Sequence, residues 1–563
     1  MVRVAASLRG SRPGGGRGWG RGEWRSFKGA AARRTLTLVL PPLVLSLALA
    51  GCMVGPDFKS ADAPIAQQWL EAGDPAVRTD HQDYEQWWTA FNDATLSNLV
   101  DLAYRQNLTL MAAGTRVLEA RAALGVAIGQ FYPQQQQLQG AVTYNQFSKS
   151  DPTTNPLNVL NNNIWKAGLA GQVGWELDFW GKFRRGVESA SASYLASIAT
   201  YDDVLVTLVG DVTTAYIGIR TLQVQLAIAR ENVVKQRGAL QIATERYRGG
   251  ASTLLDVYQA QNVLAQTQST IPALTAQLEQ GEAALRVLLG LAPESLAALL
   301  AGPQSIPVPP AEVAVGIPAD LVRRRPDIRS AELQAAAQSA RIGMTKAQLF
   351  PAFSLSGVFG GTAASIDQIP VGQVFQGTSI AFAFGPTFSW PILNYGQITN
   401  QVRVQDARLQ TLLLGYQNAV LKAQKEVESN LSAFLNGRKQ VVLLRQSVTS
   451  ANNALSVAID EYTLGTRDFT TVLTAEQNLY TAQTNLASAA GNLSTSLTNL
   501  YRALGGGWQI RKDREFVNDS VRNEMRERTD WGTLLPPGGA PPSPTPGLPA
   551  PQDRGPTVRP PEW

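Results

Sequence analysis

The stretch YRGGASTLLDVYQAQN, residues 247–262, decides the fold, because it returns 215 residues further on as YTLGTRDFTTVLTAEQ, residues 462–477. In both copies a glycine, Gly250 or Gly465, separates two long helical patterns, which predicts the tip of a helical hairpin. A repeat of about 20 to 50 residues would indicate a solenoid or a propeller. This repeat is far longer, and indicates that a whole substructure occurs twice in the chain.

The duplication extends well beyond the two tips. At the same offset the matching residues are Trp175 and Trp390, Gly181 and Gly396, Tyr201 and Tyr416, and Gly290 and Gly505. Further upstream the offset is 218, which relates Gly125, Gln130 and Pro133 to Gly343, Gln348 and Pro351. One structural unit is therefore used twice.

The basic isoelectric point of the chain comes from its first residues. The 563 residues carry a net charge of +5 and give a pI near 9.2, which on its own suggests a nucleic-acid partner. Residues 1–51 contain nine Arg or Lys and one Glu, a net +8, so the remainder carries 5 minus 8, or −3. The body of the chain is mildly acidic, and no nucleic-acid partner is expected.

The N-terminal segment has the parts of a secretory signal. Basic residues precede an apolar run, Leu36–Ala50, which is too short for a stable membrane span and ends in LAGC at residues 49–52. This ending resembles the bacterial lipobox, in which the cysteine is diacylated and becomes the new N-terminus. Cys52 is the only cysteine, so it has no partner in the chain for a disulfide. The alternative is an ordinary signal followed by a buried free cysteine.

Four segments alternate with period two and are predicted to be strands. They are Leu138–Phe147, Gly168–Phe179, Phe353–Gly361 and Ser379–Ile392. Apolar and aromatic side chains occupy one face, and small or polar side chains the other, which is typical of transmembrane β-barrel strands. A soluble sandwich with one wet face is the alternative. Four strands cannot close a membrane barrel, and open edges in lipid are costly, so several chains must pool their strands.

Long helices are predicted on both sides of each tip. Residues 181–247 and 396–462 contain no proline, and each run could form a helix of about 100 Å, three times the apolar thickness of a bilayer. Charged residues inside both runs, such as Asp203 and Lys422, exclude burial in lipid. The returning helices, Thr253–Leu289 and Phe469–Leu504, carry leucine stripes typical of a coiled-coil core. A further single helix is predicted from a cap at Asn92 or Asp93 to a point before Pro133.

These patterns predict six regions. They are a lipoprotein signal with an over-long basic start (1–51), a lipid-anchored extended segment (52–90), a first repeat (91–290, β-hairpin 138–179), a connector (291–316), a second repeat (317–508, β-hairpin 353–392) and a C-terminal tail (509–563). The tail becomes rich in proline from about residue 536, and disorder is predicted there.

Several blocks resemble the outer membrane efflux proteins, which are TolC-like, and most of all the NodT and OprM type of lipoprotein. They are LAGCMVGPDF (49–58), WW-x-x-FND-x-x-L (87–96), GIPADLVRRRPDIRSAE (316–332), IGMTKAQLFPAFSLSG (342–357), both tip motifs and ALGGGW (503–508). The resemblance implies a homotrimer in the outer membrane, with a twelve-stranded barrel and a periplasmic helical tunnel. It also implies an exit duct whose tips meet a periplasmic adaptor joined to an inner-membrane pump of the RND type.

The resemblance places the candidate gate and adaptor contacts at the tips. Candidate residues are Arg248, Gly250, Ser252, Asp256, Gly465, Arg467, Asp468, Thr471 and Thr474, and Cys52 is the candidate lipidation site. Ser252 and Thr466 are expected to cap the helices that follow the glycines. TolC-like proteins carry carboxylates that form rings at the constricted entrance, but the matching residues here are Thr471 and Thr474. A gate made of carboxylate rings therefore cannot be assigned to this chain from the resemblance. For the charged residues near the turns, the alternative is that they are ordinary solvent-exposed side chains without a function in gating.

Other functional classes fit the sequence less well. An enzyme is not expected, because His81 is the only histidine and no metal-ligand cluster or G-x-S-x-G nucleophile elbow is present. No cofactor or metal is expected either. A purely structural coiled-coil lipoprotein would leave the duplicated strands unexplained. Within transport, a duct for type I protein secretion is the alternative, and the lipobox with the NodT-like blocks favours efflux of small molecules.

Overall fold

The computed structural model describes residues 53–80, 84–148, 163–512 and 514–535. All of them belong to one compact unit, Gly51–Trp563. The predicted signal, the lipidation candidate Cys52, His81 and the tail from Pro536 lie outside the described residues.

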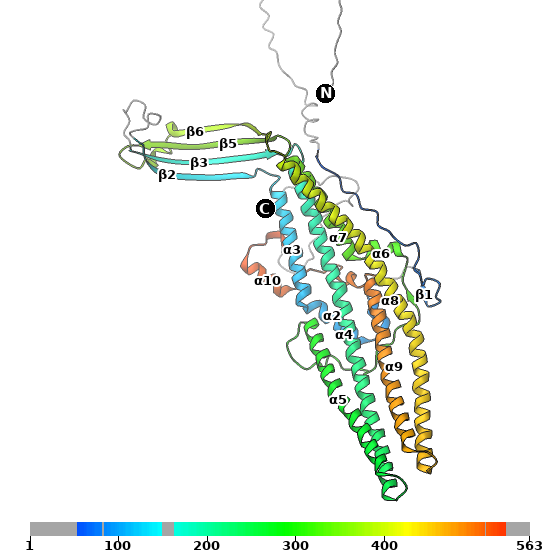
Figure 1. Ribbon diagram of the computed structural model, residues 1–563. Coiled ribbons are helices and arrows are strands. Elements are labelled where there is room, and N and C mark those ends of the chain that lie inside the picture. The colour runs from blue at the N-terminus through cyan, green and yellow to red at the C-terminus, as the bar shows by residue number, and fades with distance from the viewer. Residues whose placement is uncertain (1–52, 81–83, 149–162, 513, 536–563) are drawn as a thin grey trace, which may run out of the picture. The chain divides into compact units, whose positions relative to one another are not determined.

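Four long helices form two hairpins, as the duplication predicts (Figure 1). The first hairpin joins α4 (Lys182–Arg248) to α5 (Leu254–Leu289), and the second joins α8 (Gln397–Leu464) to α9 (Phe469–Ala503). With 67 and 68 residues, α4 and α8 are each about 100 Å long. An 18-residue window of α4 is apolar enough to cross a membrane, but 61% of it is buried inside the protein. Its apolar side chains therefore pack against other helices.

The four predicted strands form one antiparallel sheet in the order β2-β3-β5-β6. Their bounds are Gln135–Gln146, Asn163–Leu177, Ala352–Ser365 and Ile380–Ser389. The central pair joins the two repeats, because Gln172 of β3 lies opposite Val358 of β5. Within the described sheet β2 and β6 are edge strands, so their outer sides are left for pairing with other chains.

The two faces of the sheet differ as the alternation predicts. One face carries large apolar side chains, and Phe382, Phe384 and Phe388 are between 71% and 80% exposed. The other face carries polar and small side chains, with Gln137 paired to Gln172 in the register. An outward apolar band and a polar interior are the arrangement of a transmembrane barrel.

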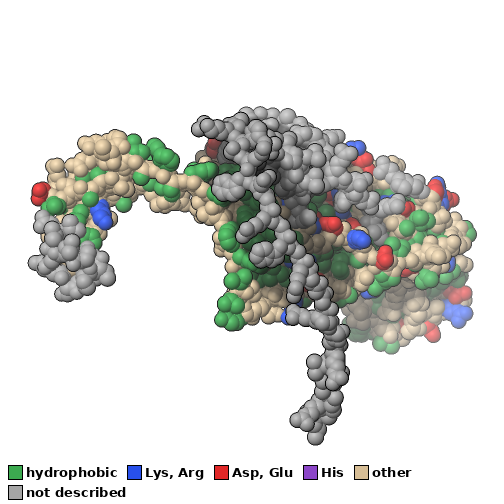
Figure 2. All heavy atoms as spheres, turned by 90° about the horizontal axis from the view of Figure 1, so that it is seen from above, with side chains coloured by type: hydrophobic (Ala, Val, Ile, Leu, Met, Phe, Trp, Pro, Cys, Tyr) green, Lys and Arg blue, Asp and Glu red, His purple; other side chains and the backbone are tan. Residues whose placement is uncertain are grey.

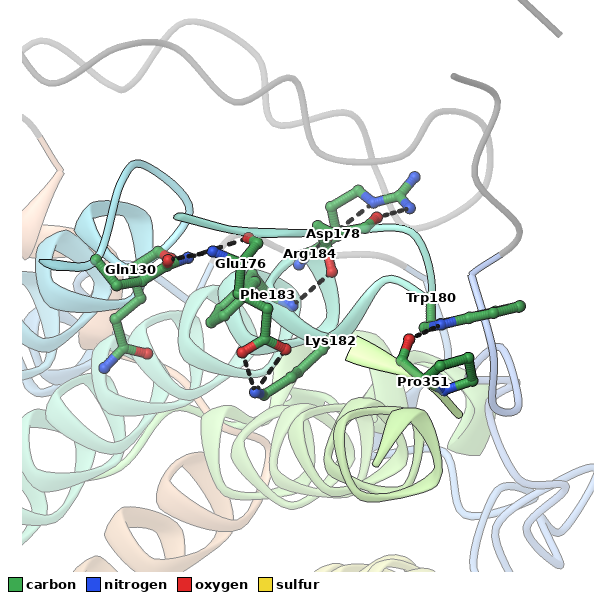
Figure 3. A network of polar contacts seen from close by, with 9 residues as sticks. Gln130, Glu176, Asp178, Trp180, Lys182, Phe183, Arg184 and Pro351 are labelled. Carbon is green, nitrogen blue, oxygen red and sulfur yellow. Dashed lines mark hydrogen bonds and ion pairs between the residues drawn. The ribbon is translucent and has the colours of Figure 1, made fainter. Parts of the chain in front are cut away.

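A polar network fastens the end of β3 to the start of α4 (Figure 3). The carboxylate of Asp178 accepts hydrogen bonds from the amides of Phe183 and Arg184 at 3.0 and 2.9 Å, which satisfies free donors in the first turn of the helix. Nearby, Lys182 forms an ion pair with Glu176 at 2.9 Å. The strand and the long helix are therefore joined by fixed contacts.

The repeat is also visible in two tryptophan hydrogen bonds. The indole of Trp175 donates to the carbonyl of Phe131 at 3.2 Å, and the indole of Trp390 donates to the carbonyl of Leu349 at 3.0 Å. In each repeat the bond links a strand, or the residue just after it, to the turn that follows a shorter helix, α3 (Leu108–Gly129) or α7 (Pro326–Ala347). The same contact thus orients both β-hairpins.

The single helix predicted before Pro133 is wrong. Two helices, α2 (Ala94–Gln106) and α3, meet at Asn107. The Asn107 side chain caps α3 by accepting from the amide of Leu110 at 2.8 Å, and its amide donates to the carbonyl of Leu288 at 2.9 Å. A capping bond combined with a tertiary contact outweighs the continuous helical pattern. The predicted cap at Asp93 is present, at 3.1 Å from the Leu96 amide.

The connector and the C-terminal segment contain helices and strands that the sequence patterns did not predict. In the connector, β4 (Val313–Ala314) pairs in parallel with β1 (Val77–Arg78), which joins the N-terminal segment to the junction between the repeats. Two short helices also form, α6 (Pro318–Arg324) after the connector and α10 (Asp519–Arg528) in the C-terminal segment.

Two large hydrophobic cores lie among the helices, and a small third cluster joins Leu118 of α3 to Val517 and Leu535. The larger core lies among the middle parts of the helices and includes Leu205, Leu431 and Leu497. The smaller core lies near the tips and includes Ala243, Leu455, Phe469 and Leu479, from α4, α8 and α9. The tips therefore have a core of their own.

Candidate functional site at the helical tips

The two hairpin tips close with the same backbone hydrogen bond. At the α4–α5 turn the amide of Ala251 donates to the carbonyl of Arg246 at 2.8 Å. At the α8–α9 turn the amide of Thr466 donates to the carbonyl of Glu461 at 3.0 Å. Bonds of this span characterise the Schellman ending of a helix. The duplication is therefore preserved down to the backbone of the turns.

Gly250 and Gly465 supply the positive φ that these turns need. Their φ angles are +71° and +80°, as expected from the sequence. A Cβ at Gly250 would meet no atom within 4 Å, and one at Gly465 would lie 3.4 Å from Nη2 of Arg246. Backbone conformation explains the glycine at Gly250 without any steric crowding.

The expected capping role of Ser252 and Thr466 is wrong. Both hydroxyls donate backwards, to backbone carbonyls of the preceding helix at 3.4 and 3.0 Å. The N-cap residues of α5 and α9 are Thr253 and Asp468, and neither makes a side-chain capping bond. The Thr466 hydroxyl thus binds a carbonyl in the last turn of α8, whereas the Ser252 hydroxyl binds a carbonyl further back in α4.

A cluster of three side chains ties the two tips of one chain together. The hydroxyl of Tyr462 donates to Oδ2 of Asp256 at 3.4 Å. Arg246 donates to the carbonyl of Thr463 at 2.8 Å, and its guanidinium carbon lies 4.8 Å from the centre of the Tyr462 ring. Tyr462 is buried, and this burial raises the pKa of its hydroxyl. We name Arg246, Asp256 and Tyr462 the tip tie.

The other charged candidates at the tips are exposed. Arg467 pairs with Glu461 of its own chain at 3.1 Å, with both side chains at least 40% exposed. Arg248 and Asp468 are exposed as well. Exposed ion pairs contribute about 0 to 1 kcal/mol each. These residues therefore stabilise the tip less than the tip tie does.

Thr471 and Thr474 lie exposed on the first turns of α9. The hydroxyl of Thr474 donates to the carbonyl of Thr470 at 2.8 Å, within its own helix. Uncharged side chains in this position cannot form a ring of carboxylates.

Glu476, one turn further along α9, is buried between the hairpins. The side chain is 3% exposed, and its Oε1 atom has no hydrogen-bond partner among the described residues. Burial raises the pKa of this carboxyl to about 7. The matching residue of the first repeat is Gln261, which is exposed. The sequence interpretation did not single out Glu476, although its replacement of the repeat-related glutamine was a visible signal.

A polar cavity of about 410 Å³ lies far from the tips, where the motif RRPDI meets the end of α9. Its wall is organised by Arg325, which pairs with Asp327 and Glu426 at 2.7 Å each and donates to the carbonyl of Ala503 at 2.9 Å. Arg325 therefore fixes the start of α7 against α8 and α9. The specific sequence of this motif serves packing between the repeats.

No group of three His, Cys, Asp or Glu side chains in the described part of the chain is placed to hold a metal ion. The geometry instead combines a sheet with a lipid-type face, helices three times as long as a bilayer is thick, and charged tips at the far end of those helices. These features define an outer membrane channel with a periplasmic helical part.

Comparison with known proteins gives the family. The sequence profile of the outer membrane efflux proteins matches residues 99–291 and 317–506. Nodulation protein T of Rhizobium leguminosarum bv. trifolii is 30% identical over 435 residues, which cover 77% of this chain and 90% of that protein. Outer membrane protein OprJ of Pseudomonas aeruginosa is 28% identical over 472 residues, which cover 83% and 95%.

Solved structures agree with this result. The outer-membrane channel OprN is 30% identical, with a TM-score of 0.75 over 81% of this chain and 100% of that one. The MtrE channel of Neisseria gonorrhoeae, in its open state, is 24% identical with a TM-score of 0.67 over 81% of this chain and 99% of that one, a likeness of fold. The chain belongs to the outer membrane efflux protein family. It is a trimeric outer membrane channel of an efflux system, and the resemblance noted in the sequence is confirmed.

Proposed function

We propose that the helical tips are the entrance of this channel, and that they open when a periplasmic adaptor, bound to an RND-type inner-membrane pump, engages them. The tip tie is the observation that carries this proposal. It joins α4, α5 and α8 of one chain at the end remote from the sheet, where substrate enters a duct whose other end lies in the outer membrane.

The tip tie is weak enough to serve as a latch. A hydrogen bond that involves a charged group contributes about 1.5 to 3 kcal/mol, with a long bond at the lower limit, and a cation–π contact at a partly exposed site contributes about 0.5 to 1 kcal/mol. Three copies in a trimer would hold the entrance closed by a few kcal/mol. Contacts made by an adaptor at the exposed residues Arg248, Arg467 and Asp468 could offset an amount of this size.

The cargo of the duct is proposed to be small molecules selected by the pump. Relatives of similar identity are named for chemically different compounds: OpmQ of Pseudomonas putida for pyoverdine export, and TtgI of the same species for toluene efflux. Because homologous ducts are named for such different compounds, we expect the pump and not the duct to select the cargo. The polar face of the sheet, which has few charged side chains, agrees with passage of this kind.

Cys52 remains the proposed lipid anchor. The residues that follow it are held at the junction of sheet and helices, since the amide of Val54 donates to the carbonyl of Trp180 at 3.1 Å and Asp57 pairs with Arg185 at 2.7 Å. An acyl chain at Cys52 would thus start close to the membrane-spanning strands, which would support the membrane insertion of the barrel.

The experiment combines susceptibility with cross-linking. A deletion strain should become more susceptible to toxic compounds, and the intact gene should restore resistance. In the complemented strain, a photo-reactive thiol probe on Ser252→Cys should capture an adaptor, whereas one on Ser356→Cys in strand β5 should not. Equal capture at both positions, or unchanged susceptibility together with no capture, would refute the proposed function.

A further inference from the structure

The four strands contain only two charged side chains, Lys166 and Glu176, both on β3. Glu176, at the end next to the helices, is neutralised by Lys182, whose Nζ lies 2.9 Å from both carboxylate oxygens. Lys166 lies at the opposite end of β3, is exposed, and forms no ion pair with any described residue. Figure 2 shows the same contrast on the face in view, with charged side chains numerous over the helices and scarce on the sheet.

The register places Lys166 on the polar face of the sheet. Its neighbours across the strands are Thr143 on β2 and Ala364 on β5. Further along the same face, Gln172 donates to Gln139 at 3.4 Å, and Gln139 donates to Gln137 at 2.9 Å. The aromatic side chains within the four strands lie on the opposite face. In a closed barrel Lys166 therefore faces the lumen.

Nothing on the described polar wall neutralises this ammonium group. Its Nζ lies 5.7 Å from the centre of the Phe147 ring, an attraction that leaves the positive charge in place. Among the described residues that connect β5 to β6, Asp367 is the one acidic residue, and it makes no ion pair with Lys166. Three chains would place three such charges at one height in an otherwise uncharged wall.

We infer that Lys166 forms a ring of three ammonium groups at the outer end of the barrel, and that this ring makes the exit favour anionic over cationic small molecules. Rings of Lys or Arg give pores a preference for anions. The inference rests on the proposed function, since it concerns the exit of the same duct. It adds a charge preference to a passage that otherwise has polar, uncharged walls.

The test measures local charge selectivity with thiol reagents added outside whole cells. Thr143→Cys places a thiol beside Lys166, about 5 Å away between Cβ atoms. Anionic and cationic methanethiosulfonates are compared at an ionic strength of about 0.01 M, where charges act over about 30 Å. Val142→Cys, the next residue on the apolar face, is the matched control, and the chain without an added cysteine measures labelling at Cys52.

We expect Thr143→Cys to react faster with the anionic reagent, and Val142→Cys to react with neither. Lys166→Gln should lower the anionic-to-cationic rate ratio by about threefold or more, and Lys166→Arg should preserve it. A ratio unchanged by Lys166→Gln, or labelling of Val142→Cys in place of Thr143→Cys, would overturn the inference. Efflux is scored separately by complementation, so a chain that labels as expected but restores no resistance contradicts the proposed function alone.

Discussion

The hydroxyl of Tyr462 donates to Oδ2 of Asp256 at 3.4 Å, across 206 residues of sequence. Tyr462 ends α8, and Asp256 lies in the first turn of α5. The contact therefore joins two hairpins that arose by duplication, at the one end where both have their tips. In the proposed gate, opening of the entrance would break this hydrogen bond or move both tips of the chain together.

Glu476 should make the stability of the hairpins depend on pH. Burial raises its pKa to about 7, above the ordinary 4.5 of an unfolded chain. The contribution of Glu476 to the free energy of unfolding is fully present below pH 4.5, where the carboxyl is protonated in both states. As the pH rises from 4.5 to about 7, the free energy of unfolding falls by about 1.4 kcal/mol per pH unit. Burial is the only cause of this shift, and no charged group among the described residues contributes to it.

Glu476→Gln should therefore raise the apparent unfolding temperature of the trimer at pH 8 and leave it almost unchanged at pH 4.5. Thermal melts in detergent, followed by circular dichroism, check this. Gln261→Glu, at the exposed position related by the repeat, adds a carboxyl without burial and should produce no such dependence. A melting temperature for Glu476→Gln that falls by the same amount at both pH values would show that the carboxyl is simply required for packing.

Gly250→Ala should loosen the α4–α5 turn. Its φ of +71° costs an L-residue about 1 to 2 kcal/mol, and no neighbouring atom adds to that cost. The adjacent Gly249 has a φ of −79°, so Gly249→Ala is a matched control. Hydrogen–deuterium exchange of residues 240–262 should quicken in the first variant and stay near wild type in the second. Identical exchange in the two variants would argue against the role of the positive φ.

Cys52→Ala should abolish incorporation of radioactive palmitate and leave most of the protein in the outer membrane. Acyl chains contribute about 0.8 kcal/mol per buried CH₂, but the sheet already provides a membrane-spanning surface in the trimer. Membrane fractionation and labelling of the same cultures check this. Mature protein whose N-terminus lies upstream of Cys52 would disprove lipidation.

The sequence predicted the elements and their order because both depend on local patterns. Strand alternation and proline-free helices are properties of neighbouring residues, and the duplication confirmed each pattern with a second copy. The break at Asn107 was missed because it depends on Leu288, far away in the sequence. The pairing of β1 with β4 was missed for a similar reason. Each strand has only two residues, too few to show the alternation of apolar and polar side chains that identifies a strand.

The sequence predicted where the two helical turns lie but not the contacts between them. Gly250, Gly465 and Asp256 were identified from the repeat, whereas Arg246 and Tyr462 were not. Tyr247 and Tyr462 occupy the same place in the two copies, yet Tyr247 is 43% exposed and Tyr462 is 4% exposed. Packing of one hairpin against the other creates that difference. The sequence repeat alone cannot show which of the two tyrosines is buried.

The difference between these tyrosines gives the most direct test of the gate. Single-channel conductance of the purified trimer in planar bilayers is measured for Tyr462→Phe and for Tyr247→Phe. Loss of the hydrogen bond to the Asp256 carboxylate, at about 1.5 kcal/mol for a bond as long as 3.4 Å, should raise the open probability of Tyr462→Phe by about tenfold. Tyr247→Phe should behave as wild type. Equal open probabilities in wild type and both variants, in protein confirmed to be trimeric, would contradict a gate at the helical tips.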